Sequence, residues 1–308
     1  MTVCYIDCSP FMRTLLTPEL AARLPGLAVH GEPESPDAVV ERLRTATIAL
    51  NGHTPMPAAL LRRCAQLRSI VFLGSGASSY IDIEAAMALG IEVRTVPGYG
   101  DRTVAEHAMA LMLSASRRVA EMDRALRHGQ WEPLEGMDLA GKRLGVIGAG
   151  GIGVTFMRMA AAFGMDVVAW NRSPRATPPP GPLLPLDELL ETSDVVSLHL
   201  ALTPETRGFL DASRLARLRP GAILVNTARG ALIDEAALTA GLTAGRPGHA
   251  ALDVFAEEPL PPGHALTRLS NVTLTAHAGY KTPEASRRLL EMAIDLAARD
   301  VAAFSDGG

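Results

Sequence analysis

The chain has 308 residues, of which 48% are hydrophobic and 20% charged, so it carries enough apolar side chains to fill the cores of two domains. A formal net charge of −4 and an isoelectric point of about 6.1 argue against nucleic acid and anionic membrane surfaces as partners. No run reaches the roughly 18 uninterrupted apolar residues of a membrane span, and the first residues lack the features of a secretion signal. Cys4, Cys8 and Cys64 show no spacing for a disulfide framework or a metal site. We therefore expect a cytoplasmic protein with reduced thiols, no metal, and small molecules as ligands.

Short apolar runs alternate with segments of helical spacing through the first hundred residues. The runs predict strands over 3–6, 27–30, 48–50, 69–73 and 91–96. Helices are expected over 18–24, 36–44, 57–63 and 83–89. The first two begin with Thr17-Pro18 and Ser35-Pro36, which suit an N-cap followed by the first helical position. This part of the chain therefore predicts a small α/β domain.

A second region follows a break at residues 97–100. Residues 103–127 predict one long helix, apolar on most faces, which we expect to lie buried between two domains. Strands are expected over 144–147, 166–170, 194–198, 222–226, 249–252 and 272–275, mostly with helices between them, which is typical of a doubly wound parallel sheet. The proline-rich stretch 174–185 is expected to be a surface loop without chemistry. A last helix over 283–304 is expected to return to the first domain, which gives one domain of 1–98 with 282–308 and another of 99–281.

Residues 143–153 contain the clearest motif of the chain. An apolar run over 144–147 leads into Gly148, Gly150 and Gly153 in the spacing G-x-G-x-x-G, and helical spacing follows. The glycines permit a tight turn, a close approach of the backbone to a pyrophosphate, and close packing of the helix on the strand. Because a helix N-terminus offers unpaired N–H groups to phosphates, these glycines together with Gly151 and Ile152 predict a dinucleotide-binding site.

Three polar residues follow three successive strands of the predicted sheet: Arg229, Glu258 and His277. The carboxyl ends of parallel strands share one edge, where ligands of such sheets bind. There an arginine can hold a substrate carboxylate and the oxygen at C2, and a histidine can take or give the proton of a C2 hydroxyl. A carboxylate can orient the imidazole and favour its charged form. Each residue alone is more often structural, and Glu257 could replace Glu258, but the conjunction indicates oxidation of a hydroxy acid.

In these motifs the chain resembles the D-isomer-specific 2-hydroxyacid dehydrogenases, a family that includes phosphoglycerate, glyoxylate/hydroxypyruvate and D-lactate dehydrogenases. Residues 148–153, 197–206, 224–234, 251–259 and 275–279 carry the resemblance, which covers nearly the whole length. It implies an α/β fold of two domains, with a Rossmann-type doubly wound parallel sheet for the cofactor and a smaller, discontinuous, flavodoxin-like α/β domain for the substrate. It also implies a homodimer, substrate binding by Arg229, orientation by Glu258 and acid/base catalysis by His277.

The resemblance implies further binding residues. Backbone N–H groups of Gly74, Ser75 and Gly76 would bind the substrate carboxylate, although serines replace the usual aspartate after these glycines. The nicotinamide side of the cofactor would be lined by Thr103, Thr227, Ala228, Asp253 and Gly279. Asp253 could instead brace the loop after its strand. His107 and His199 could both approach the cleft, but a structural hydrogen-bonding role is expected for each. Trp131 is expected to be a packing or subunit-contact residue rather than a substrate ligand.

The residues after the second strand of the larger sheet bear on the choice of cofactor. Enzymes that use NAD place a carboxylate there for the ribose 2′-hydroxyl, but this strand ends in Trp170-Asn171-Arg172-Ser173. Asn171 would not repel a 2′-phosphate, and Arg172, Ser173 and Arg175 could bind one, unless Arg172 stacks on adenine or points to solvent. NADP(H) is therefore favoured as the cofactor, with NAD(H) possible.

These observations predict an oxidoreductase that transfers a hydride between a nicotinamide cofactor and a small D-2-hydroxy acid or 2-keto acid. It would be of the glyoxylate/hydroxypyruvate reductase or phosphoglycerate dehydrogenase kind. The alternative is a cofactor-sensing, corepressor-like interaction protein without significant turnover, which extended tails would support, whereas this chain is expected to begin and end close to its core. Glu258 disfavours a formate dehydrogenase, which would pair its histidine with an amide. A methyltransferase would not need the three strand-end residues.

Overall fold

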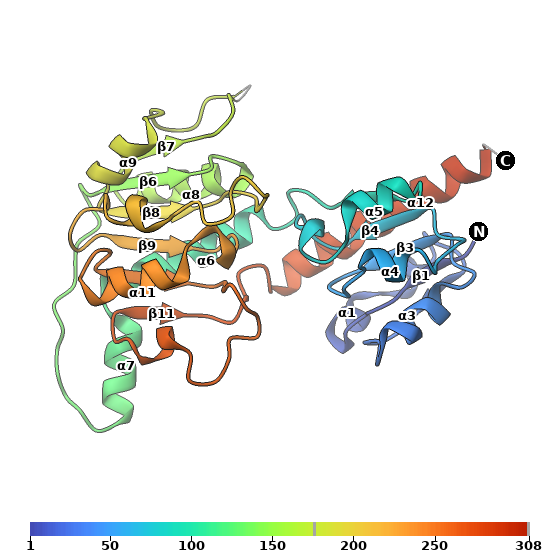
Figure 1. Ribbon diagram of the computed structural model, residues 1–308, viewed down its shortest axis with the longest axis horizontal. Helices are drawn as coiled ribbons and strands as arrows, with labels where there is room; N and C mark the ends of the chain where they lie inside the picture. Colours follow the sequence, from blue (N-terminus) through green and yellow to red (C-terminus); the bar gives the residue numbers. More distant parts are fainter. Residues whose placement is uncertain (175–176, 307–308) are drawn as a thin grey trace. The chain divides into compact units, whose positions relative to one another are not determined.

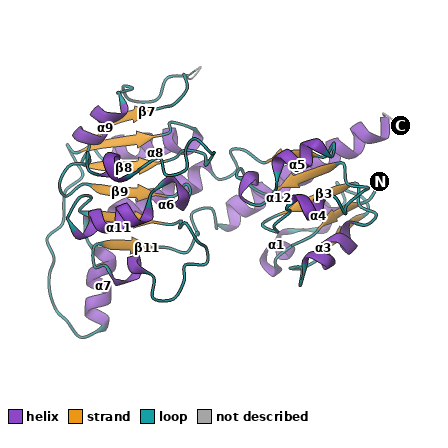
Figure 2. Ribbon diagram, viewed as in Figure 1, coloured by secondary structure: helices purple, strands orange, loops and turns teal. Residues whose placement is uncertain are grey.

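The computed structural model describes residues 1–174 and 177–306. The chain divides into two compact units: unit 1 is Met1–Gly100 with Lys281–Gly308, and unit 2 is Asp101–Tyr280. The α/β fold predicted from the sequence is confirmed, because each unit is a parallel sheet with helices on both faces (Figures 1 and 2). In the described chain, every helix is too short or too polar to cross a membrane.

The sheet of unit 1 has the strand order β2-β1-β3-β4-β5, with all neighbours parallel, which is the flavodoxin-like order. Its strands are β1 (Val3–Tyr5), β2 (Leu27–Val29), β3 (Ile48–Asn51), β4 (Ser69–Phe72) and β5 (Glu92–Thr95). Its helices are α1 (Pro10–Leu15), α2 (Pro18–Ala21), α3 (Pro36–Leu43), α4 (Ala58–Leu61), the 3₁₀ turn η1 (Ala77–Ser79), α5 (Ile83–Ala88) and α12 (Pro283–Asp306). The sequence analysis missed α1, although Ser9 caps it and Pro10 begins it, as at the predicted helices.

The alternation of side chains along these strands builds a core on each face of the sheet. Ile6 and Ile70 pack with α3, α4 and α5 on one face, whereas Tyr5 and Val71 pack with α12 on the other. A buried carboxylate also links α12 to the strands: Asp300, 1% exposed, lies 2.7 Å from Nε of Arg94 and accepts a hydrogen bond from Ser69 (2.6 Å). The C-terminal helix is therefore part of the core of unit 1.

The sheet of unit 2 has six strands in the order β11-β10-β9-β8-β6-β7, all parallel. The strands are β6 (Arg143–Ile147), β7 (Asp166–Trp170), β8 (Val195–Leu198), β9 (Ile223–Asn226), β10 (His249–Leu252) and β11 (Val272–Leu274). The helices are α6 (Asp101–Ser116), α7 (Val119–Arg127), α8 (Gly151–Ala162), α9 (Leu186–Thr192), α10 (Ala212–Leu215), η2 (Gly230–Leu232), α11 (Glu235–Thr243) and η3 (Ala265–Arg268). Because β6 pairs with β7 on one side and β8 on the other, the turn after β6 lies where the strand order reverses, which is where ligands of such sheets bind.

The single long helix predicted over 103–127 is wrong, because two helices occupy this segment. Arg118 between them has φ 52, in the left-handed region, and its guanidinium pairs with Glu121 (2.8 Å). Helix α6 packs against α8, β9 and β10, and its apolar faces are explained by this burial within unit 2. Helix α7 has no buried residue and lies beyond the β11 edge of the sheet (Figure 1).

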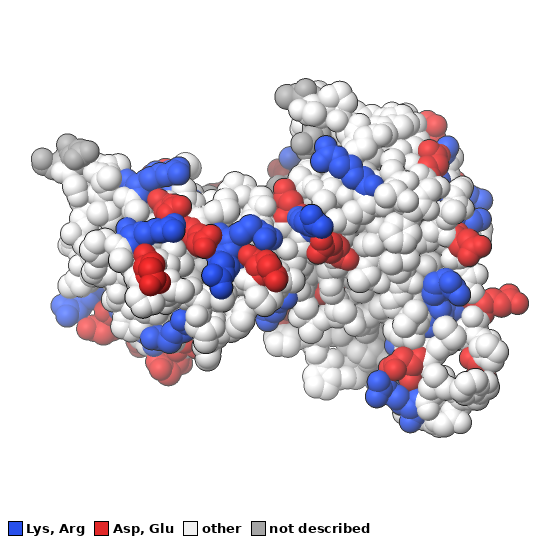
Figure 3. Space-filling model, turned by 180° about the vertical axis from the view of Figure 1, so that it is seen from behind, with Lys and Arg blue, Asp and Glu red and all other residues white. Residues whose placement is uncertain are grey.

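Charged side chains of opposite sign are interspersed on the surface. Figure 3 shows Lys and Arg beside Asp and Glu across the face that it draws. Many are paired, as in Arg127–Asp123 (2.8 Å) and Arg217–Glu191 (2.6 Å). Within each unit, the described basic side chains on this face are therefore interspersed with acidic ones.

Candidate functional site

The glycine-rich turn between β6 and α8 has the shape of a cradle for phosphates. Gly148 has φ 100, and a Cβ there would lie 2.7 Å from the carbonyl oxygen of His199. A Cβ on Gly153 would overlap the carbonyl oxygen of Gly148, so this glycine lets α8 pack onto the turn. By contrast, nothing lies within 4 Å of a Cβ built on Gly150, the N-cap of α8, although one on Gly151 would overlap the carboxylate of Asp101. Among the described residues, no side-chain hydrogen bond caps this helix. The open space and the uncapped N–H groups of Gly151, Ile152 and Gly153 fit a pyrophosphate.

A buried hydroxyl gives a second test of whether these residues fit a dinucleotide. The Oγ1 atom of Thr227, which follows β9, is buried and has no hydrogen-bond partner among the described residues. Such groups are rare in proteins unless a ligand or water satisfies them. Ala228 follows it, with its N–H bound to Asn226 (3.0 Å), and Thr103 is buried in the first turn of α6. Thr227 therefore fits a position where a bound cofactor supplies the missing partner.

Asn171 helps to hold the glycine-rich turn. Its Oδ1 accepts a hydrogen bond from the N–H of Ala149 (3.0 Å), and its Nδ2 donates to the carbonyl oxygen of Ser173 (2.9 Å). The side chain of Arg172 is 56% exposed, with Nη1 4.0 Å from Glu205. Arg175, which the sequence analysis also considered, lies outside the described residues. A neutral amide and an exposed guanidinium therefore follow β7.

His277 and Glu258 are in direct contact at the carboxyl edge of the sheet. Nδ1 of His277 lies 2.6 Å from Oε2 of Glu258, and Oε1 of Glu258 accepts from the N–H of Phe255 (2.9 Å). Burial alone would raise the pKa of Glu258. The hydrogen bonds from His277 and Phe255, together with the charges of His277 and Arg229, outweigh this effect, so the pKa lies below its ordinary value. Glu258, and not Glu257, is the carboxylate in contact with the imidazole. The contact uses Nδ1, so Nε2 of His277 is the nitrogen left for a substrate.

Arg229 belongs to the same edge. It follows β9, and its carbonyl oxygen is held by the side chain of Asn226 (2.9 Å). A Cβ on Gly230 would overlap the backbone of Phe255, so this glycine lets the Arg229 segment pack against the loop of Glu258. Among the described residues, the one hydrogen bond of the guanidinium runs from Nη1 to the carbonyl oxygen of Ala228 (2.6 Å). Since a guanidinium has five N–H donors, most of them remain for a ligand.

Asp253 braces the loop that carries His277. Its carboxylate, 1% exposed, accepts hydrogen bonds from the N–H groups of Ala278 and Gly279, at 2.9 Å each. The sequence offered bracing of the loop after its own strand, β10, as the alternative to cofactor binding, whereas the loop that Asp253 holds follows β11. His107 of α6 also contacts Asp253, which the sequence did not predict.

His199 has the hydrogen-bonding role expected of it. Its Nε2 lies 2.9 Å from Oγ of Ser197, and its ring packs 5.5 Å from that of Phe156. Desolvation lowers its pKa to about 4, so the imidazole is neutral near pH 7. His199 is therefore an uncharged side chain that packs against Phe156 of α8.

The loop predicted to bind the substrate carboxylate belongs to unit 1 and follows β4. The N–H of Gly74 already donates to the carbonyl oxygen of Phe72 (2.8 Å), and its own carbonyl oxygen accepts from Val96 (2.9 Å). A Cβ on Gly74 would lie 2.7 Å from the ring of Phe72. In the described structure, Ser75 and Gly76 have no backbone acceptor for their N–H groups, so these two are the donors available to an anion.

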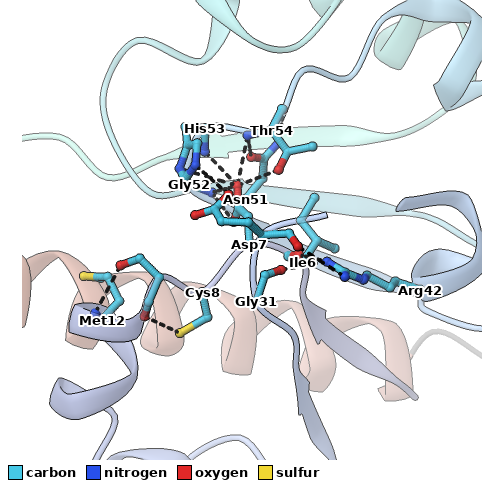
Figure 4. Close-up of polar contacts among 12 residues, drawn as sticks. Ile6, Asp7, Cys8, Met12, Gly31, Arg42, Asn51, Gly52, His53 and Thr54 are labelled. Carbon is cyan, nitrogen blue, oxygen red and sulfur yellow. Dashed lines mark hydrogen bonds and ion pairs between the residues drawn. The ribbon is translucent and has the colours of Figure 1, made fainter. Parts of the chain in front are cut away.

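The sequence analysis missed a buried carboxylate of unit 1, that of Asp7, which is 1% exposed. Asp7, two residues after the end of β1, accepts hydrogen bonds from the N–H groups of Gly52, His53 and Thr54 and from the Thr54 hydroxyl, at 2.8 to 2.9 Å (Figure 4). The ring of His53 also contacts Glu32 (2.9 Å). The signal was present, because Asp7 follows a strand as Arg229 does. Asp7 fixes the loop after β3, which neighbours the loop of Gly74 at this edge of the sheet.

Comparisons with known proteins agree with this geometry. Residues 109–279 match the family described as "D-isomer specific 2-hydroxyacid dehydrogenase, NAD binding domain". The chain is 35% identical to a glycerate dehydrogenase of Methylorubrum extorquens, over 85% of this chain and 84% of that protein, and 40% identical to a glyoxylate reductase of Aeropyrum pernix, over 80% and 76%. Among solved structures, it resembles an acyclic imino acid reductase in complex with NADPH and D-arginine, with a TM-score of 0.87, 28% identity and 98% of each chain covered.

Proposed function

Because this chain belongs to the D-isomer-specific 2-hydroxyacid dehydrogenase family, we propose that it reduces small 2-keto acids such as glyoxylate or hydroxypyruvate to D-2-hydroxy acids. The reaction is a hydride transfer with a nicotinamide cofactor and runs in either direction. The observation that carries the proposal is the contact between Nδ1 of His277 and Glu258 at the sheet edge that also bears Arg229. The three unpaired, buried cysteines support a reducing compartment, and we place the enzyme in the cytoplasm.

The three residues have different tasks. Arg229 holds the substrate carboxylate and polarises the oxygen at C2 with its charged fork. His277, protonated, donates the proton on Nε2 to that oxygen, and in the oxidative direction the neutral ring takes it back. Glu258 orients the ring through Nδ1 and stabilises the imidazolium. When bound, the nicotinamide supplies or accepts the hydride at C2.

We assign the cofactor to unit 2, and we assign to unit 1 the donors that bind the substrate carboxylate in addition to Arg229. In unit 2, the residues that would hold the cofactor are Thr103, Gly148, Gly150, Gly151, Ile152, Gly153, Asn171, Arg172, Ser173, Thr227, Ala228, Asp253 and Gly279. The open cradle at Gly150 and the orphaned hydroxyl of Thr227 support this assignment. In unit 1, the N–H groups of Ser75 and Gly76 would bind the carboxylate beside Gly74.

The test is the loss of reduced-nicotinamide absorbance with glyoxylate, hydroxypyruvate, pyruvate and larger 2-keto acids, each with NADPH and NADH. We expect turnover with at least one small acid and a D-configured product. Tight cofactor binding without turnover on any acid would instead support the corepressor-like alternative, which the enzymes named above do not support.

We propose NADP(H) as the preferred cofactor, and Asn171→Asp should reverse this preference. Aspartate can keep the hydrogen bond from the N–H of Ala149. Its negative charge repels a 2′-phosphate, whereas its carboxylate oxygens can accept a hydrogen bond from a 2′-hydroxyl. Since hydrogen bonds to charged groups contribute about 1.5–3 kcal/mol, the ratio of kcat/KM for NADPH to that for NADH should fall by about tenfold or more. Arg172→Gln should also lower this ratio, because it removes a cation that could bind the 2′-phosphate. Its matched control is Arg143→Gln, which removes an arginine at the opposite end of the same sheet and should leave the ratio unchanged. An unchanged ratio in Asn171→Asp contradicts the proposal.

We also propose that two copies of the chain associate, as the family resemblance implies. The exposed apolar side chains of Val119, Leu126 and Trp131, at 51%, 52% and 85%, support an interface along α7 and the segment after it. Light scattering should give a mass of twice 32.5 kDa. Leu126→Glu should shift the mass towards the monomer because it would bury a charge. A monomeric wild type contradicts the proposal.

A further inference from the structure

The loop that carries His277 has an unusual backbone. Residues 275–279 follow β11, and His277 has φ 49, in the left-handed region that only a few per cent of non-glycine residues adopt, asparagine, aspartate and histidine more often than the others. Such a conformation persists only where surrounding contacts enforce it. The direction of the imidazole therefore depends on what holds this loop.

Asp253, after β10, holds the loop on both sides of His277. Its carbonyl oxygen accepts a hydrogen bond from the N–H of His277 (2.8 Å). Its carboxylate binds the N–H groups of Ala278 and Gly279, and the hydroxyl of Thr275 donates to it (2.6 Å). Burial alone would raise the pKa of Asp253. The hydrogen bonds from His107, Thr275, Ala278 and Gly279 outweigh this effect, so the pKa lies below its ordinary value. An ionised carboxylate is thus the fixed acceptor for the loop.

His107 completes this network from α6. Its Nε2 lies 3.2 Å from Oδ1 of Asp253 and 3.0 Å from Oγ1 of Thr275. The single hydroxyl hydrogen of Thr275 is directed to Asp253, so both neighbours of Nε2 are acceptors and Nε2 must carry a hydrogen and donate. Gly279 leaves room for this packing, because a Cβ there would lie 3.0 Å from Oδ2 of Asp253 and 3.4 Å from Cδ2 of His107.

We propose that His107 is a positioning residue for the reaction: its Nε2–H fixes Asp253 and Thr275, and these hold the loop so that His277 stays against Glu258. This inference rests on the proposed function, since the proton transfer that it supports is that of 2-keto acid reduction. His107 is not itself the acid/base group, because its Nε2 is committed to two protein acceptors.

His107→Leu tests the proposal, because it removes the donor and keeps an apolar side chain of moderate size. We expect kcat for 2-keto acid reduction to fall by about tenfold or more, since a displacement near 1 Å can cost this much, with the KM of the keto acid changed less than about threefold. His107→Gln, which carries an N–H donor on a chain of similar reach, should restore most of the rate. His264→Leu is the matched control, because His264 is a similarly buried histidine (20% against 22% exposed) that contacts a carboxylate, Glu235, elsewhere in unit 2. It should leave kcat nearly unchanged.

A double-mutant cycle separates positioning from general stability. In a His277→Asn background, His107→Leu should cause no further loss of the residual rate, because both changes act on the same proton transfer. A further loss equal to that in the wild type, or an unchanged kcat in His107→Leu alone, would overturn the proposal.

A spectroscopic measurement keeps the two proposals distinguishable. Absence of turnover in the wild type would overturn the proposed function only. In that case, NMR of the enzyme with isotope-labelled histidine reports the ring of His277, assigned by its loss in His277→Asn. We expect this signal to shift or broaden in His107→Leu and not in His264→Leu, and an unchanged signal would overturn the positioning role.

Discussion

Replacement of His277 by asparagine should slow 2-keto acid reduction by about 100- to 10,000-fold, the range that a positioned general acid contributes. Asparagine is the informative substitution because it tolerates the left-handed backbone of this position, where φ is 49. Its amide can still hydrogen-bond to Glu258, but it carries no proton that it can transfer. The loss should therefore appear in kcat, measured by NADPH absorbance at saturating substrate.

Two controls decide what such a loss means. NADPH should bind His277→Asn with nearly the wild-type Kd, because the phosphates are expected at the turn of residues 148–153, and the Tm should change little. A variant that keeps more than a tenth of the wild-type kcat with these properties intact would show that another group supplies the proton, and the assignment of His277 would be wrong.

Motifs that lie within one short segment could be found from the sequence. The strand, the glycine-rich turn and α8 are encoded by about twenty consecutive residues, and Arg229, Glu258 and His277 each follow a strand that its apolar run predicts. Parallel strands bring such positions to one edge whatever the loop details are. This is why it could be predicted from the sequence that these three residues, which are far apart in the chain, lie at one edge of the sheet.

Contacts that depend on tertiary packing could not be found in the same way. His107 reaches Asp253 only because α6 packs on β10, and the two residues are 146 positions apart. The break at Arg118 was hidden because helical spacing continues across it, and a single left-handed residue changes the direction of the chain without a glycine. Asp7 follows a strand as Arg229 does, but its hydrogen-bond partners could not be found from the sequence. They lie in the loop after β3, and Gly52 is 45 positions away in the chain.

Glu258→Gln should lower the rate of keto acid reduction by about 100-fold near neutral pH, less than the full contribution of a general acid, because the ring can keep its orientation and loses its charge partner. Reduction needs the imidazolium, which the carboxylate 2.6 Å away favours. The measurement is kcat for reduction as a function of pH.

Glu257→Gln is the matched control, since it removes the same charge from the neighbouring residue, which makes no contact with the imidazole in the described structure; it should leave kcat near neutral pH nearly unchanged. The acid limb of the pH profile gives a separate test of the contact between Glu258 and His277. Because the pKa of Glu258 is lowered in the folded protein, its interaction with His277 is fully present above the ordinary range of a glutamate and is lost only as the pH falls through the lower, folded value. Wild type should therefore keep its reductase rate through the ordinary glutamate range. An equal loss of kcat in both glutamine variants would mean that net charge, and not the contact with His277, sets the rate.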